Sequence, residues 1–549
     1  MNTTNWINIG DLPRYEGGFT QLYRDYINDF QKVQRFFEID FHDLESLKKY
    51  AHRLEQRFRH REILVEVLLQ QNQQYGVGSV SLDNIRLLAN EKTFAVVTGQ
   101  QVGMFGGPLY TIYKTITTIK LANKLSSIYP EYKFVPIFWL EGEDHDYEEV
   151  NKVGLLNSDH TQTTVDYLVN GKQSAKNMGP VGEIIFDDSI DTFYSNLLKT
   201  LGSSEFRQSL IELLSSAYRP GVTFNHAFAS LMNKYFDGEG LVFISANDKR
   251  FKQLLSPIFQ KELSEYPRVS QSIIQQSAEL EEDYHAQIKT KALNLFYFFK
   301  GGRYFIEPRE NDFSLKGTRH FIPKEELLRI AVENPELLSP NVALRPICQD
   351  TILPTLVYVA GPSEIAYYAQ LKKVYQYFEL TMPMIYPRAT VTLTEEKLER
   401  IMDKYQLDFV ELFGDVEKIN QKIIDLVSEI KIDEMFNEAS RRIDDLTNEM
   451  KFGINYIDTT LMGALENTRM KIEQQVFLLK EKVAEAQKRK YDIALRQIAK
   501  VTNFIVPNKN FQERELSIVH FMNKHGLDFI RNLSAEIGID QFKHQIIRL

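Results

Sequence analysis

The sequence contains a single cysteine, Cys348, among 549 residues. Without a second thiol no intrachain disulfide can form, and zinc or iron–sulfur sites built from several cysteines are excluded. No basic segment followed by an apolar segment comes after the first methionine, so we expect no signal peptide. Apolar runs are also short, since Phe134–Leu140 is far below the roughly 20 residues that a membrane-spanning helix needs. These absences favour a cytoplasmic protein, because a reducing compartment keeps thiols free.

An excess of one charge is also missing. The chain carries 65 basic and 74 acidic side chains, for a net charge of −9, so it has no global attraction to nucleic acid or to an anionic membrane. Hydrophobic residues make up 43% and charged residues 25%, as in ordinary globular proteins. At roughly 100–200 residues per domain, the length allows about three or four domains around a sizeable core.

Proline is absent from one long interval. The chain has 18 prolines, but none lies between Pro387 and Pro507. A stretch without helix breakers that is rich in Glu, Lys, Gln, Ile and Leu predicts long helices. Within it, apolar residues follow the 4-3-4-3 spacing that is typical of a coiled-coil seam. The seam residues are Ile472, Val476, Leu479, Val483 and Ala486.

We therefore interpret residues 390–505 as an antiparallel coiled-coil arm, with a break or kink within 452–463. A narrow apolar seam is typical of helices that pack against another chain. The periodicity is equally compatible with a helical hairpin inside one chain, so both arrangements remain open.

Upstream of Pro387, short apolar runs rich in β-branched residues alternate with helical segments. The expected strands are 94–98, 134–140, 241–245, 356–360 and 384–386. A helix that starts at Pro108 connects the first two strands, so these strands should be parallel. Residues 293–306 predict a β-hairpin instead. The predicted fold class is α/β: a doubly wound parallel sheet with connecting insertions, joined to a long α-helical coiled-coil arm.

These patterns divide the chain into six segments. The expected segments are 1–90, mostly helical; 91–150, the first βαβ unit; 151–340, insertions and further core strands; 341–389, the second half of the core; 390–505, the arm; and 506–549, a C-terminal segment that returns to the core.

The first candidate site is a glycine-rich loop after the 94–98 strand. Ligands of open parallel sheets bind beyond the carboxyl ends of the strands, and glycines let the backbone approach a ligand. The free N–H groups of a helix that starts at Pro108 favour an anion. The spacing matches neither a dinucleotide fingerprint nor a P-loop, and a tight strand-to-helix turn is the competing interpretation. The candidate binding residues are Gly99, Gln100, Gln101, Gly107, Pro108, Tyr110, Thr111 and Lys114.

The second candidate site follows the 134–140 strand. Glu143, Asp144, His145 and Asp146 are consecutive, and a histidine between carboxylates can exchange protons near neutral pH. Neighbours on an extended segment point to alternate faces, so at most two of the four converge, and we expect no metal site. A solvated loop that caps a helix is the alternative interpretation.

The third candidate site surrounds the 356–360 strand. It repeats the first one, since Gly-Pro-x-x-x-x-Tyr occurs at 107–113 and again at 361–367. Arg345 could clamp a carboxylate through two hydrogen bonds or form a structural ion pair with Asp350. Cys348 is expected to be a buried residue rather than a nucleophile, because no base is assignable to it. The candidate binding residues are Arg345, Asp350, Gly361, Glu364 and Tyr367.

Together these segments resemble the cysteine-adding enzyme family of bacillithiol biosynthesis. The similar stretches follow one another in order from about residue 94 to the C-terminus. They are Val96–Gln101 with Gly107–Lys114, Val135–Trp139 with Gly142–Asp146, Ser339–Val342 with Leu344–Pro346, Gln349–Thr351, Gly361–Pro362 with Glu364–Tyr367, Pro387–Arg388, and Pro507–Asn508 with Gln512–Arg514.

The resemblance implies a Rossmann-like core, a coiled-coil arm that forms a homodimer, and a ligase reaction on small molecules. That reaction joins the carboxyl group of cysteine to the glucosamine amine of glucosaminyl-malate and gives bacillithiol. The family core is similar to class I nucleotide-binding ligase folds. However, the His-x-Gly-His and Lys-Met-Ser-Lys-Ser motifs of their adenylate-forming members are absent. ATP/ADP as the nucleotide and an already activated cysteine are therefore both compatible with the sequence.

The implied reaction needs a base that removes a proton from the glucosamine amine. We expect His145, flanked by Asp144 and Asp146, to be that base. The helix starts at Pro108 and Pro362 are expected to hold the malate carboxylates or a phosphate.

The remaining roles fall to charged residues near the strand ends. Arg345 or Arg388 is expected to bind the same anions. Glu143 or Glu364 is expected to hold the ammonium group of cysteine or the sugar hydroxyls.

Two other functional classes remain open. The arm favours a coiled-coil dimer whose nucleotide-binding core acts as a scaffold or regulator of a partner enzyme. The acidic segment Glu143–Asp146 is compatible with a metal-dependent hydrolase. Polar residues at the strand ends favour an enzyme, because a scaffold has no need for them.

Overall fold

The computed structural model describes residues 2–13, 19–157, 159–171, 177–310, 312–427 and 431–549. The chain divides into two compact units. Met1–Thr394 together with Pro507–Leu549 form the core unit, and Glu395–Val506 form the arm. Strand β14, at Thr390–Thr394, falls in the core unit although its sequence lies inside the range expected for the arm. None of the helices in the described ranges is both long enough and apolar enough to cross a membrane.

The core unit is built on a five-stranded parallel sheet in the order β13-β12-β2-β3-β6. Its strands are β2 (Thr93–Gln101), β3 (Lys133–Glu141), β6 (Val242–Ser245), β12 (Thr355–Ala360) and β13 (Met384–Pro387). In chain order this arrangement is 3-2-1-4-5, the strand order of a doubly wound Rossmann-like sheet. The predicted fold class is therefore confirmed. The order reverses between β2 and β12, which is the point where such sheets bind ligands.

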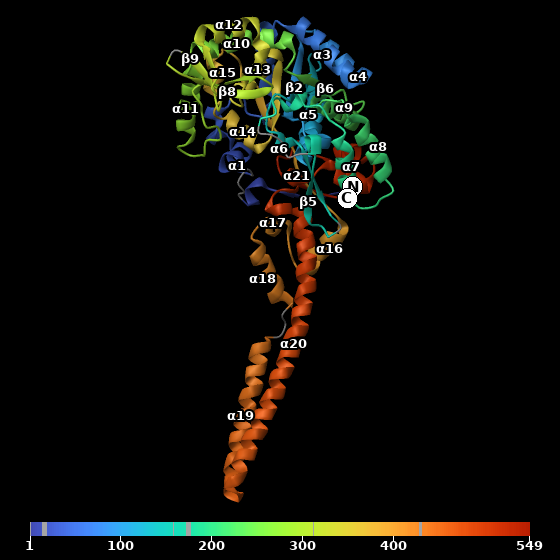
Figure 1. Ribbon diagram of the computed structural model, residues 1–549, viewed down its shortest axis with the longest axis vertical. Coiled ribbons are helices and arrows are strands. Elements are labelled where there is room, and N and C mark those ends of the chain that lie inside the picture. Colours follow the sequence, from blue (N-terminus) through green and yellow to red (C-terminus); the bar gives the residue numbers. More distant parts are fainter. Residues whose placement is uncertain (1, 14–18, 158, 172–176, 311, 428–430) are drawn as a thin grey trace. The chain divides into compact units, whose positions relative to one another are not determined.

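Burial explains why these segments are strands. The β2 and β3 residues are almost all buried, and continuous apolar runs of this kind form parallel strands that are covered on both faces. Helix α5 (Leu109–Ile128) connects β2 to β3 and packs against both strands (Figure 1). Pro108 is the residue before the helix rather than its first residue. Gly99 allows β2 and β3 to approach closely, because a side chain there would lie 3.1 Å from Trp139.

Smaller sheets surround the central one. An antiparallel sheet has the order β10-β9-β8-β7-β11, and its β7–β8 pair is the predicted hairpin. Its strands are β7 (Leu295–Phe299), β8 (Gly302–Pro308), β9 (Asp312–Leu315), β10 (Phe321–Pro323) and β11 (Leu338–Pro340). A hairpin of β4 (Lys152–Leu156) and β5 (Gln162–Asp166) follows β3. A third sheet pairs β1 (Asn2–Ile7) and β14 with the last strand, β15 (His544–Arg548). The expectation of a mostly helical start therefore missed β1.

All regular secondary structure of the arm is helical in the parts that the structure describes. Its helices are α16 (Glu396–Lys404), α17 (Phe409–Leu412), α18 (Val416–Val427), α19 (Ile432–Ile457) and α20 (Met462–Ile505). The two longest, α19 and α20, pack along each other in opposite directions (Figure 1). The expected break falls at 458–461, where the Asp458 side chain accepts a hydrogen bond from the Thr460 N–H at 2.8 Å.

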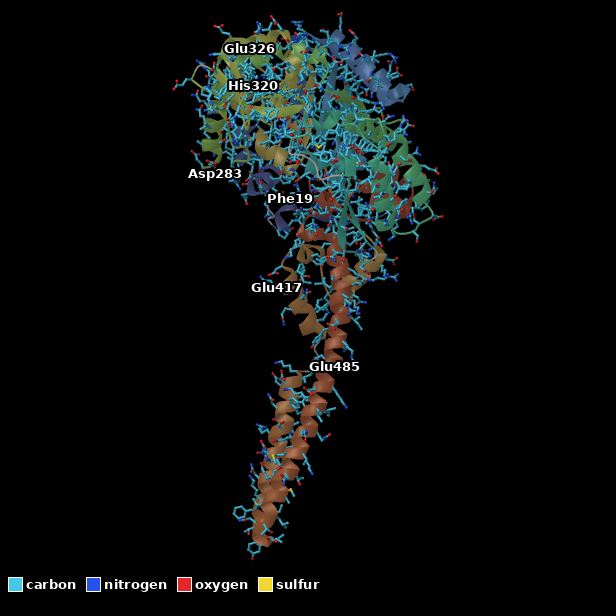
Figure 2. All side chains as sticks on the ribbon, viewed as in Figure 1. Phe19, Asp283, His320, Glu326, Glu417 and Glu485 are labelled. Carbon is cyan, nitrogen blue, oxygen red and sulfur yellow. The ribbon has the colours of Figure 1, made fainter. Side chains whose placement is uncertain are left out.

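The predicted seam is only partly covered within one chain. Ile472 is 43% exposed and Leu479 is 55% exposed, both on α20, the helix on which Figure 2 labels Glu485. The contact between α19 and α20 therefore leaves apolar surface of α20 in solvent.

Candidate active site

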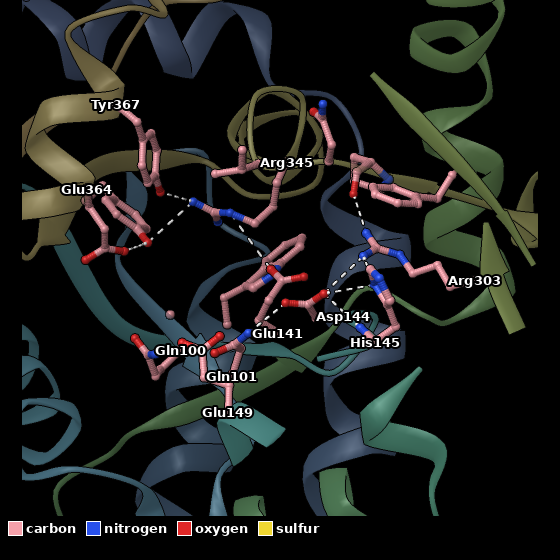
Figure 3. A pocket seen from close by; sticks show the side chains of 17 residues that line it. Gln100, Gln101, Glu141, Asp144, His145, Glu149, Arg303, Arg345, Glu364 and Tyr367 are labelled. Atoms are coloured by element: carbon pink, nitrogen blue, oxygen red, sulfur yellow. Dashed lines mark hydrogen bonds and ion pairs between the residues drawn. The ribbon is translucent and has the colours of Figure 1, made fainter. Parts of the chain in front are cut away.

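The carboxyl ends of β2, β3 and β12 surround a cavity of about 470 Å³ (Figure 3), called the main cavity below. It lies at the switch point between β2 and β12, where the two halves of the sheet diverge and a ligand can enter. The first two of these strands contribute Gly99, Gln100, Gln101, Trp139 and Glu141. The sheet itself thus positions one side of the site.

The insertions and helices complete the cavity. Helix α13 (Arg345–Ile352) contributes Arg345, and helix α14 (Pro362–Tyr368) contributes Glu364 and Tyr367. The β7–β8 hairpin adds Phe296 and Arg303. Residues far apart in the chain therefore meet around one space.

Asp144, His145 and Arg303 form a cluster on the cavity wall (Figure 3). The Arg303 guanidinium donates to Asp144 Oδ1 at 3.2 Å and lies 3.3 Å from His145 Nδ1. His145 Nδ1 also lies 3.3 Å from Asp144 Oδ1. Gln101 donates to the other Asp144 oxygen at 2.6 Å. The carboxylate is thus held from three directions, and it in turn fixes the neighbouring imidazole.

Arg303 is itself firmly anchored. It donates to Ser339 Oγ at 3.0 Å and to the Pro340 carbonyl at 2.8 Å, and its guanidinium lies 3.9 Å from the centre of the Phe296 ring. Burial by itself would raise the pKa of Asp144, but the hydrogen bond with His145 and the charge of Arg303 hold that pKa well below its usual range. Asp144 is therefore an anion at neutral pH.

Arg345 organises the opposite side of the cavity. Its guanidinium donates to Tyr367 Oη at 2.8 Å and to Gln349 Oε1 at 2.9 Å, and it lies 3.8 Å from Glu141 Oε2. Glu141 also accepts a hydrogen bond from the Trp139 indole at 3.1 Å. Burial raises the pKa of Glu141 to about 7, although Arg345 acts to lower it. Glu141 can thus exchange a proton near neutral pH at the wall of the main cavity.

Lys114 and Glu364, two predicted binding residues, bind each other. Lys114 Nζ lies 2.7 Å from Glu364 Oε2 and donates to the Gly99 carbonyl at 2.6 Å. Burial by itself would raise the pKa of Glu364, but the Lys114 ammonium and the Gly361 N–H lower it below its ordinary value. Glu364 also accepts from the Tyr358 hydroxyl at 2.7 Å. Because α5 carries Lys114 and α14 carries Glu364, this pair ties the two helix starts together across the switch point.

The structure separates the predicted site residues into three groups. Those that line the main cavity are Gly99, Gln100, Gln101, Asp144, His145, Arg345, Glu364 and Tyr367. Asp146 lines an adjoining cavity of about 900 Å³, whereas Gly107, Pro108 and Tyr110 line a smaller one of about 200 Å³. Those that line none of these three cavities are Thr111, Lys114, Glu143, Asp350, Gly361 and Arg388.

Four of the residues outside the cavities are engaged within the protein, contrary to the roles expected from the sequence: Lys114, which pairs with Glu364, and Glu143, Arg388 and Asp350. Glu143 forms a buried ion pair with Lys252, because it faces away from its neighbours Asp144 and His145. Arg388 forms another with Glu513, in which each side chain is 3% exposed. Asp350 accepts a hydrogen bond from the Tyr375 hydroxyl at 2.5 Å and makes no ion pair with Arg345.

The helix starts that were expected to hold anions also have protein partners. The Leu109 N–H donates to the Leu516 carbonyl at 2.9 Å, and the Gly361 N–H donates to Glu364 Oε2 at 2.7 Å. These two donors are therefore occupied in this structure, and an anion would have to displace a protein group.

Arg303 and Phe296 are among the site residues that the sequence did not predict, and Trp139, Glu141, Glu149 and Tyr358 of the main cavity were not predicted either. The hairpin that carries Arg303 and Phe296 was predicted, but a hairpin says nothing about where its side chains point. The only signal was an arginine beside Gly301 and Gly302, within a run of aromatic residues.

No group of three or more His, Cys, Asp or Glu side chains that could hold a metal ion occurs among the described residues. Cys348 is fully buried, and this burial raises the pKa of its thiol well above the usual range. A buried thiol of this kind is inert rather than nucleophilic.

Comparison with known proteins identifies the family. The model of "Bacillithiol biosynthesis BshC, N-terminal Rossmann-like domain" matches residues 9–389, and that of the BshC "C-terminal coiled-coil domain" matches residues 391–549. Relatives named "Putative cysteine ligase BshC" from Salinibacter ruber and Chloroherpeton thalassium are each 36% identical. The alignments cover 97% of this chain and 97% and 98% of those proteins. Matches of this extent confirm the resemblance drawn from the motifs, and the chain belongs to the BshC family of bacillithiol biosynthesis.

Proposed function

We propose that the protein is a ligase that joins the carboxyl group of L-cysteine to the glucosamine amine of glucosaminyl-malate, which forms bacillithiol in the last step of its synthesis. The observation that carries this proposal is the cluster of Asp144, His145 and Arg303 on a cavity at the switch point of the sheet. The names of the relatives support a cysteine ligase. A cytoplasmic location is part of the proposal.

His145 is the proposed base. The amine nitrogen attacks the activated carboxyl carbon of cysteine, a C–N bond forms, the bond from that carbon to the leaving group breaks, and the amine proton passes to the imidazole. The proposal places the imidazole hydrogen on Nδ1, which lies 3.3 Å from Asp144 Oδ1, so that Nε2 is the nitrogen that accepts this proton. Arg303 neutralises part of the charge of Asp144 and fixes the position of this carboxylate. The carboxylate in turn orients the imidazole of His145.

ATP is the proposed source of energy for activation of the cysteine carboxyl group. The two arginines of the main cavity, Arg303 and Arg345, already hold Asp144 and Glu141, and the helix-start donors at Leu109 and Gly361 are occupied. Among the described residues, the main cavity therefore has no unengaged set of donors for a triphosphate. An already activated cysteine is the other route.

A homodimer through the arm is also part of the proposal. The observation that supports it is the exposure of the seam residues Ile472 and Leu479 on α20. A second chain that packs along this helix would remove the exposed apolar surface from water.

The decisive experiment incubates purified protein with cysteine and glucosaminyl-malate, with and without ATP, and detects the cysteinyl product by mass. We expect product only with ATP. In H145Q, kcat/KM should fall by about 10²- to 10⁴-fold with the fold intact by circular dichroism. If folded wild-type protein forms no product in either tube, the ligase proposal is wrong as stated and the scaffold alternative gains support.

A further inference from the structure

The small cavity beside the main one, called the side cavity below, has a volume of about 200 Å³. The two cavities share Gln100, Gln101 and Glu149 as a common wall. Gln101 donates to Asp144 in the catalytic cluster. The two cavities therefore lie next to each other, on either side of these residues.

Arg514 also lines the side cavity; it lies on α21 (Gln512–Glu515) and is half-buried. Its guanidinium lies 6.0 Å from the centre of the Tyr110 ring. Within the part of the chain that the structure describes, no hydrogen bond or ion pair joins this guanidinium to another residue. Lys152, an exposed residue, lines the same cavity.

The other arginines of this region differ in that respect. Arg303, Arg345 and Arg388 each lie within ion-pair distance of a carboxylate. A half-buried guanidinium has lost part of its hydration, and its five donors favour a planar or tetrahedral anion. Arg514 and Lys152 are thus the cations lining the side cavity that form no ion pair within the described residues.

The acidic residues of the side cavity do not fill that role. Glu515 accepts hydrogen bonds from Asn508 at 3.0 Å and Asn510 at 2.8 Å. Burial raises the pKa of Glu149 above its usual range, although a hydrogen bond from Gln101 lowers it.

We propose that the side cavity binds a small dianion through Arg514, with Lys152 contributing a second positive charge. The chemistry is that of paired carboxylates or a phosphate. If the proposed function holds, the source is the malate group of the amino-sugar substrate, because that group occupies the sugar carbon next to the carbon that bears the amine. An amine placed at His145 then directs the malate past Gln100 and Gln101 toward Arg514.

The test first measures binding without any ligation reaction, so that it stands apart from the proposed function. Wild type, R514M, R514K and the control R531M are titrated with L-malate and with inorganic phosphate by calorimetry. Arg531, on α23 (Phe529–Glu536), is an exposed arginine of the same unit that lines none of the three cavities. We expect R514M to weaken binding by about ten- to a hundredfold, R514K to retain part of it, and R531M to match wild type.

Comparison of the two anions shows whether the side cavity binds the malate group of the substrate or a phosphate group. Binding of malate in preference to phosphate assigns the cavity to the substrate, and the reverse assigns it to a phosphate group; either result, if lost in R514M, supports the site. In the ligation assay, R514M should raise KM for glucosaminyl-malate and leave KM for cysteine unchanged. If folded wild type binds neither anion at millimolar concentration, or if R514M binds both as tightly as wild type, the proposal is overturned.

Discussion

Replacement of Arg388 by methionine is expected to destabilise the core unit by about 3 to 5 kcal/mol, the usual effect of removing one partner from a buried ion pair. Both side chains of the Arg388–Glu513 pair are 3% exposed. The guanidinium donates to both carboxylate oxygens, one of them at 3.0 Å, and to the Ala389 carbonyl at 2.9 Å. In R388M, the Val391 N–H at 3.1 Å is the one hydrogen-bond donor that the described residues still offer to the buried charge of Glu513.

The double variant R388M/E513Q tests whether the unpaired charge of Glu513 causes the loss of stability in R388M. It removes both charges, so it should be more stable than the sum of the two single losses predicts, with a coupling of about 0.5 to 3 kcal/mol. Urea unfolding followed by tryptophan fluorescence is the appropriate assay, because the two tryptophans, Trp6 and Trp139, lie in the core unit. The reasoning is refuted if R388M unfolds like wild type while its affinity for glucosaminyl-malate drops, since Arg388 would then bind substrate as the sequence suggested.

Three further predictions follow from other residues. Burial raises the pKa of Glu262 from 4.5 to about 7, although its bonds with Asn294 lower it. The folded state thus holds a proton that the unfolded state has released, and stability should fall as pH rises through this window. At about 1.4 kcal/mol per pH unit, the loss in the free energy of unfolding is roughly 3 kcal/mol. In E262Q, the urea concentration at the midpoint of unfolding should depend less on pH than in wild type. R303A should lower kcat about a hundredfold, because the Asp144–His145 pair loses its anchor. R309A, at the residue that directly follows the same strand β8, should not, and equal losses in both variants would contradict the role of Arg303. The double variant I472E/L479E should convert a dimer into a monomer by light scattering, and an unchanged mass would place the dimer contact elsewhere.

Most of the fold could be predicted from local patterns. The five core strands are continuous apolar runs, and a helix between the first two implies parallel pairing, so the doubly wound sheet followed from the sequence. The long helices followed from the missing prolines between Pro387 and Pro507. Residues that are neighbours in the sequence determine these features, so the sequence pattern is enough to predict them.

Half of the candidate site could not be predicted in this way. Glu143 and Asp144 are adjacent in sequence, yet one pairs with buried Lys252 and the other faces the cavity, because side chains alternate along an extended segment. Arg303 and Asp144 form an ion pair although they are 159 positions apart in the sequence. Arg388 pairs with Glu513, which is 125 positions away. Such pairings depend on how distant elements pack, which no local pattern records.

The sheet formed by β1, β15 and β14 affects how the chain folds during synthesis. Its middle strand, β15, is the last element of the chain, and it pairs with β1 from the beginning and with β14 from just before the arm. Synthesis proceeds from the N-terminus at about 5 to 20 residues per second. Strand β1 therefore stays unpaired until its partner β15 has been synthesised and has left the ribosome. The α19–α20 hairpin has contacts close in sequence, and contacts of this kind form fast. The arm is therefore expected to be helical while the core unit is still open at its edge, and chaperones that shield exposed strands would act on β1 and β14 during that interval.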